Sequence, residues 1–157
     1  MSSSDDQLAR LRREIDVVDD ALHDLIMRRA ALVDDVAAAK REAGTLSTYL
    51  RPGREAAILR RLAARNSSVF PTPALLRIWR ELLCTMLPVQ GPFSIIVGGD
   101  STALWDTARD FYGSDTNMRG VPDGIQAAQA VADGSTELAV VDAHDQQLLT
   151  AMATTDA

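Results

Sequence analysis

The sequence has few of the residues that would point to several common classes of protein. Its 157 residues include one cysteine, Cys84, so the chain cannot form an internal disulfide, which fits a reducing compartment. No apolar run approaches the roughly 20 residues of a membrane-spanning helix. Residues 1–6 lack the basic and apolar regions of a secretory signal. We therefore expect a cytoplasmic protein with no membrane partner.

Aromatic residues are also scarce throughout the chain, and basic residues are scarce after residue 90. Aromatics make up 4% of the chain, so its core must rest on Leu, Ile, Val and Ala. Residues 91–157 carry 2 Lys+Arg against 10 Asp+Glu, which argues against a nucleic-acid partner. Residues 1–90 carry 14 against 12, and their arginines suit a small anionic ligand. The two histidines, His23 and His144, have no metal-ligand spacing, and we expect no metal site.

The first segment has the apolar period of one long helix over residues 5–43. Steps of three and four place on one face Leu8, Leu11, Ile15, Val18, Leu22, Leu25, Leu32 and Val36. No Gly or Pro interrupts the run before Gly44, so the helix should be about 55 Å long. A helix of that length cannot bury its stripe within so short a chain. We expect it to pair with a second long helix, most simply its own copy in a homodimer.

The rest of the chain divides at Gln90-Gly91-Pro92. Before this point we expect a loop over 44–51, a short helix from Pro52 to about Arg65, and a third helix from Thr72 toward Leu87. After it, strands at 93–97, 116–121 and 137–141 alternate with helices at 101–112 and 123–132, which predicts a small parallel βαβ unit. The expected division is a helical domain over 5–90, an α/β segment over 92–142, and a tail over 143–157 that is a weak helix or disordered.

Two cations interrupt the apolar stripe of the long helix. Arg29 and Lys40 are eleven residues apart, which differs from three whole turns by only about 20°, so they share the apolar face. A buried cation needs an anionic partner, which favours a ligand site here. The alternative is that both side chains reach solvent at the edge of the stripe.

Arg12 adds a constraint on that site. It lies 17 residues from Arg29, roughly 25 Å along a rigid helix, so the two cannot hold one small ligand from the same chain. If the long helix pairs antiparallel with its copy, Arg12 of one chain approaches Arg29 and Lys40 of the other. The pattern then predicts a site shared between two chains.

Three further polar residues lie beside the apolar faces of the shorter helices. Arg54 shares a face with Ile58 and Leu62, and Glu55 follows it. Glu55 could equally be an acid that stabilises the first turn of its helix. Gln90 extends the apolar stripe of the third helix, or is simply a polar helix end.

Taken together, these residues resemble the all-helical (AroQ-class) chorismate mutases over residues 5–90. The resemblance rests on the order and spacing of Leu11-Arg12, Ile15-Asp16, Asp19, Leu22, Leu25, Arg29, Val36, Lys40, Arg51-Pro52, Arg54-Glu55-Ala56, Ile78-Trp79-Arg80-Glu81 and Gln90. It implies a mainly α fold of three helices (long, short and medium) that forms an intertwined dimer, followed here by a small α/β appendage.

The resemblance also implies an activity, the rearrangement of chorismate to prephenate in phenylalanine and tyrosine biosynthesis, with no cofactor. Arg29 and the partner's Arg12 would clamp the two substrate carboxylates. Lys40 and Gln90 would donate to the ether oxygen as negative charge develops there. The remaining roles fall to residues of the shorter helices: Glu55 would accept from the ring hydroxyl, and Arg54 would orient the carboxylate-binding group.

The sequence departs from the family pattern at three positions. Arg51 stands where some members carry an acid, and Met86 stands at a substrate-binding position where a serine is common. Pro88 removes a helical hydrogen bond just before Gln90, which we expect to displace that side chain.

Residues 93–141 faintly resemble the opening lobe of a prephenate dehydratase. The likeness consists of a strand, Gly98-Gly99, a helix ending at Phe111-Tyr112-Gly113, then Val121-Pro122, a second helix, and Ala139-Val-Val-Asp142. The Thr-Arg-Phe signature of an active dehydratase is absent from the sequence. The hypothesis is a vestigial or truncated domain without catalysis of its own.

Two other functions fit the helical segment. An isochorismate-pyruvate lyase on the same fold also needs cationic clamps for carboxylates, although the Arg54-Glu55 pair and Gln90 favour the mutase. A degenerate, non-catalytic dimerisation module would use its arginines only in surface ion pairs.

Overall fold

The computed structural model describes residues 3–44 and 50–155. The chain divides into two compact units, Met1–Ser47 and Thr48–Ala157, and each is described by itself. The loop expected over 44–51 falls largely on residues 45–49, which lie outside the described residues. Among the helices that are described, none is both long enough and apolar enough to cross a bilayer.

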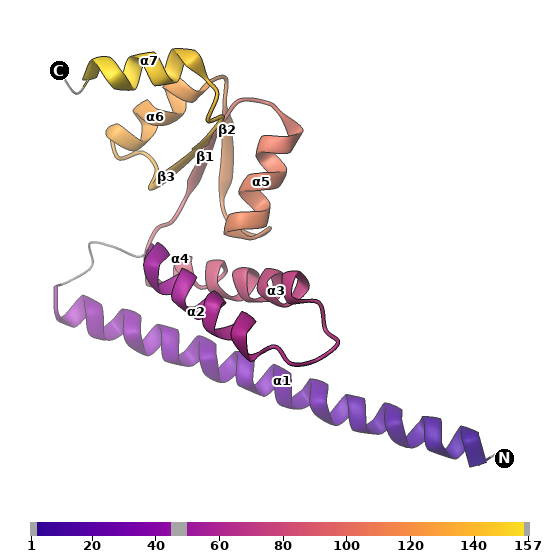
Figure 1. Cartoon of the computed structure of the whole chain (residues 1–157). Coiled ribbons are helices and arrows are strands. Elements are labelled where there is room, and N and C mark those ends of the chain that lie inside the picture. Colours follow the sequence, from indigo (N-terminus) through magenta and orange to yellow (C-terminus); the bar gives the residue numbers. More distant parts are fainter. Residues whose placement is uncertain (1–2, 45–49, 156–157) are drawn as a thin grey trace. The chain divides into compact units, whose positions relative to one another are not determined.

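The first unit contains the predicted long helix, α1 (Ser3–Glu42), which runs without a break for 40 residues (Figure 1). Asp5 and Asp6 lie in its first turn and Lys40 and Arg41 in its last, where each charge sign is favoured by the helix dipole. At 1.5 Å per residue the helix is about 60 Å long. All eight side chains of its apolar stripe are at least 42% exposed in the single chain. This face therefore still has apolar surface to bury.

In the second unit, α2 (Pro52–Arg65) packs against α3 (Thr72–Cys84). Pro52 lies at the start of α2. Proline is favoured there because the first N–H groups of a helix have no partner within the helix, so its missing N–H group costs nothing. Asn66 closes the turn between the two helices, because its amide nitrogen donates to the Phe70 carbonyl at 2.8 Å and to Thr72 Oγ1 at 3.0 Å.

The expectation that the third helix runs to Leu87 was wrong at its end. Helix α3 stops at Cys84, and a separate short helix, α4 (Leu87–Gln90), follows after Thr85 and Met86. Pro88 explains the break, because it has no N–H group to donate to the Cys84 carbonyl four residues earlier, and its ring clashes with that carbonyl.

The rest of the second unit is the predicted βαβ arrangement. Strands β1 (Ile95–Gly98), β2 (Met118–Val121) and β3 (Leu138–Val141) form a parallel sheet in the order β2-β1-β3. Figure 1 shows α5 (Thr102–Tyr112) on one side of this sheet, and α6 (Gly124–Ala132) with α7 (Gln146–Thr155) on the other. The central strand β1 is fully buried, as is typical of parallel sheets covered on both faces. Of the two alternatives for the tail, the structure has the helix, with residues 156–157 outside the described part.

Side chains of β1 alternate between two apolar clusters. Ile96 packs with Ala127 and Ala130 of α6. Ile95 packs on the other face with Phe93 and with Cys84 and Leu87, which belong to the helical part of the chain. The α/β segment and the end of α3 thus share one apolar core.

Candidate active site

Helix α1 carries three of the predicted site residues on one rigid element. Arg12 is exposed, whereas Arg29 and Lys40 are partly buried. Loss of hydration lowers the pKa of the Arg29 guanidinium, which means that its charged form is held in an unfavourable environment. Because α1 is continuous, the separation of roughly 25 Å between Arg12 and Arg29 holds. These three residues belong to the first unit, and the other four belong to the second.

Glu55 is the predicted residue with the most distinctive environment in the second unit. It lies in the first turn of α2 and is partly buried. Burial raises the pKa of its carboxyl group, and the positive charge of Arg80 on α3 opposes this rise. The adjacent Arg54 is exposed. A buried acid with a nearby but separate cation can accept a hydrogen bond strongly, because little water competes for it.

Met86 and Gln90 lie around the short helix α4. Met86 is the residue before it, and Gln90 is its last residue, and both are partly buried. The break at Cys84 therefore places these two predicted residues on a short element of their own rather than on a continuation of α3.

Glu55 and Arg80 line a cavity of about 250 Å³ within the second unit. Apolar side chains of α2 form one side of it, and Phe111 and Tyr112, at the end of α5, form another. Arg80, Phe111 and Tyr112 are not among the site residues predicted from the sequence. Arg80 was visible as part of the Ile78–Glu81 pattern, but nothing in the sequence pairs Phe111 and Tyr112 with α2.

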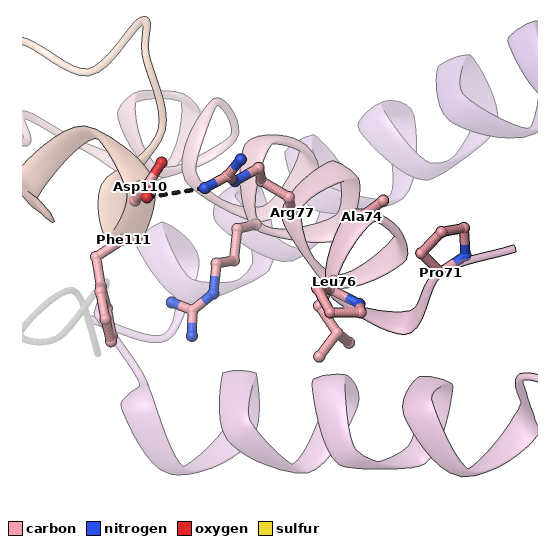
Figure 2. Close-up of a pocket in the computed structure, with 8 residues that line it drawn as sticks. Pro71, Ala74, Leu76, Arg77, Asp110 and Phe111 are labelled. Atoms are coloured by element: carbon pink, nitrogen blue, oxygen red, sulfur yellow. Dashed lines mark hydrogen bonds and ion pairs between the residues drawn. The ribbon is translucent and has the colours of Figure 1, made fainter. Parts of the chain in front are cut away.

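A second cavity, of about 530 Å³, shares Arg80 and Phe111 with the first and is drawn in Figure 2. Arg77 of α3 reaches Asp110 of α5 there, with 2.9 Å between the guanidinium nitrogen and the carboxylate oxygen. The guanidinium carbon of Arg80 lies 4.2 Å from the centre of the Phe111 ring, a cation–π contact. Arg80 and Phe111 thus line both cavities.

Comparison with known proteins identifies the family. The profile of the family described as chorismate mutase type II matches residues 11–91, more than half of the chain. The chain belongs to this family. All seven predicted site residues fall inside the matched segment, whereas Phe111 and Tyr112 fall outside it.

Similar curated proteins are longer than this chain. A bifunctional chorismate mutase/prephenate dehydratase from Pseudomonas aeruginosa is 28% identical over 140 residues, which is 87% of this chain and 38% of that protein. Proteins of the same description from Stutzerimonas stutzeri and Neisseria gonorrhoeae are 26% identical over 143 residues (88% of this chain, 39% of that protein) and 29% identical over 119 residues (75% and 32%). The chain thus spans less than two fifths of the length of the relatives it matches.

Proposed function

We propose that this chain is a chorismate mutase, which rearranges chorismate to prephenate for phenylalanine and tyrosine biosynthesis in the cytoplasm. The observation that carries the proposal is the family match over residues 11–91. In this reaction an ether C–O bond breaks as a new C–C bond forms within one molecule, so no nucleophile or general base is required. The protein must hold a compact conformer and stabilise developing charge.

We propose that the carboxylates of the substrate are bound at a dimer interface. Arg29 of one chain and Arg12 of the partner subunit would form bidentate, charge-assisted hydrogen bonds with them. Two observations support the dimer: the exposed apolar stripe of α1, and the length of helix that separates these arginines within one chain. The partial burial of Arg29 supports an anionic ligand there, because a bound carboxylate would offset the loss of hydration.

We propose that the remaining site residues act on the ether oxygen and the ring. Lys40 and Gln90 would donate to the ether oxygen, and Glu55 would accept from the ring hydroxyl. Arg54 would orient the carboxylate-binding group, and Met86 would contact the substrate. The raised pKa of Glu55 fits a carboxylate that is shielded from water and binds one polar group of a ligand.

The test is turnover of two substrates by the purified chain. With chorismate we expect loss of substrate and formation of prephenate, and with isochorismate we expect no release of pyruvate. Pyruvate from isochorismate, without conversion of chorismate, would favour the lyase instead. No turnover of either would favour a non-catalytic dimerisation module.

For the α/β segment we propose no dehydratase activity of its own. Its described part forms three short strands and two helices, and one of its apolar clusters includes Cys84 and Leu87 of the mutase segment. Prephenate incubated with the chain should persist as long as it does in buffer, and faster loss would overturn this proposal.

A further inference from the structure

The cavity beside Glu55 is formed by both parts of the second unit. Its floor and one side come from α2 and α3, which lie in the mutase segment. Its remaining wall is the end of α5, where Phe111 and Tyr112 lie outside that segment. The environment of a predicted mutase residue is therefore set in part by the α/β segment.

The wall is held in place by several specific contacts with α3. Asp110 pairs with Arg77, the Phe111 ring lies under Arg80, and the Phe111 carbonyl accepts from Cys84 Sγ at 3.6 Å. The Ser114 amide donates to Glu81, with 3.1 Å to each carboxylate oxygen. Asp110 before the wall, Phe111 within it and Ser114 after it thus all contact α3.

Gly113 shows how closely this wall meets α3. A Cβ atom at this position would lie 3.0 Å from Glu81 Oε2 and 3.2 Å from the Cys84 Cβ atom, and the residue has a φ of +83°. Only glycine combines this conformation with so close an approach at little energetic cost. Glycine at position 113 therefore allows the α/β segment to pack closely against α3 of the mutase segment.

Glu55 and Arg80 face this cavity without neutralising each other. In the described part of the chain no ion pair within 4.0 Å joins them. Glu81, Cys84 and Tyr112 are the other titratable groups of this cluster. Burial first, and then the charge of Glu55, raise the pKa of both the thiol and the phenol, that of Cys84 to about 11, so both stay neutral near neutral pH.

We propose that the α/β segment completes the mutase site: Phe111 and Tyr112 shield Glu55 from water, and Arg80 is a positioning residue that keeps Glu55 ionised. This inference rests on the proposed function. Water exclusion strengthens the hydrogen bond that Glu55 accepts from the substrate. Arg80 supplies the positive charge without which a shielded carboxyl group would take up a proton.

The test is the pH profile of kcat/KM for chorismate in three variants. Phe111→Ala admits water to Glu55, so the acidic limb of the profile should move to lower pH and kcat/KM should fall by roughly tenfold. Arg80→Met removes the positive charge, so the limb should move to higher pH. Phe70→Ala is the matched control, because Phe70 has similar exposure (46% against 53% for Phe111) but lines neither cavity, and its profile should equal that of the unmodified chain.

The pH of the acidic limb does not depend on what fraction of a variant is folded. A loss of folded protein would lower kcat/KM at every pH but would not shift this limb. If the unmodified chain turns over chorismate and the limbs of Phe111→Ala and Arg80→Met coincide with its own, the inference is overturned and the proposed function stands. If the unmodified chain has no turnover, the proposed function fails first and this inference fails with it.

Discussion

Gly113→Ala tests how closely the α/β segment is fitted to α3. Gly113 has a φ of +83° and a ψ of 157°, a region that is almost restricted to glycine and costs other residues about 1–3 kcal/mol. The new methyl group would also meet Glu81 Oε2 at 3.0 Å and the Cys84 Cβ atom at 3.2 Å. Overpacking of this kind adds typically about 1–3 kcal/mol. We expect the free energy of unfolding in urea to fall by the sum of the two effects.

Gly134→Ala is a control for a positive φ without a close neighbour. Its φ is +76°, but a Cβ atom there would have no neighbour within 4 Å. Gly113→Ala should therefore destabilise the chain more than Gly134→Ala does, and contact with α3 should contribute about 1–3 kcal/mol of the difference. It should also lower kcat/KM for chorismate, whereas the control should not. Equal losses of stability in the two variants would refute the close fit between the segments.

Three other predictions concern single charges. Arg29→Ala should abolish chorismate turnover, because it removes one clamp of the substrate carboxylates, while size-exclusion chromatography still shows a dimer. Glu55 has a raised pKa in the folded chain, so its ionisation destabilises the fold as pH rises through that pKa. Glu55→Gln should therefore increase the free energy of unfolding at about pH 7 relative to its effect at about pH 4, while turnover falls. The Arg77–Asp110 pair is exposed, so a double-mutant cycle in urea should give a coupling of at most about 1 kcal/mol.

Local sequence patterns were sufficient to predict most of the elements. The unbroken period before Gly44 predicted α1, and the change of period after Gln90 predicted the parallel sheet, because both depend on neighbours a few residues apart. The predicted end of α3 was wrong, because Pro88 acts not only on Gln90 but also on the carbonyl of Cys84, four residues before the proline.

The sequence predicted which residues of each helix belong to the candidate site, but not how residues of different elements come together. Periodicity placed Arg29 and Lys40 on one face of α1, and the family pattern singled out Glu55. The cavity around Glu55 could not be predicted, because Phe111 and Tyr112 reach it through the packing of α5 against α3, which no local period encodes. The sequence does not pair residues so far apart in the chain, and the structure supplies this wall of the site.

Mixing two inactive variants tests most directly the claim that this is a mutase with sites shared between two chains. Arg12→Ala and Arg29→Ala homodimers should each fail to convert chorismate, because every site lacks one clamp. After unfolding together and refolding at equal concentration, half of the dimers should be mixed, and one of the two sites in each should be intact. We predict recovery of about one quarter of the unmodified activity. No recovery, with mixed dimers present by mass spectrometry, would contradict the shared site, and turnover by Arg29→Ala alone would contradict the assignment of the clamp.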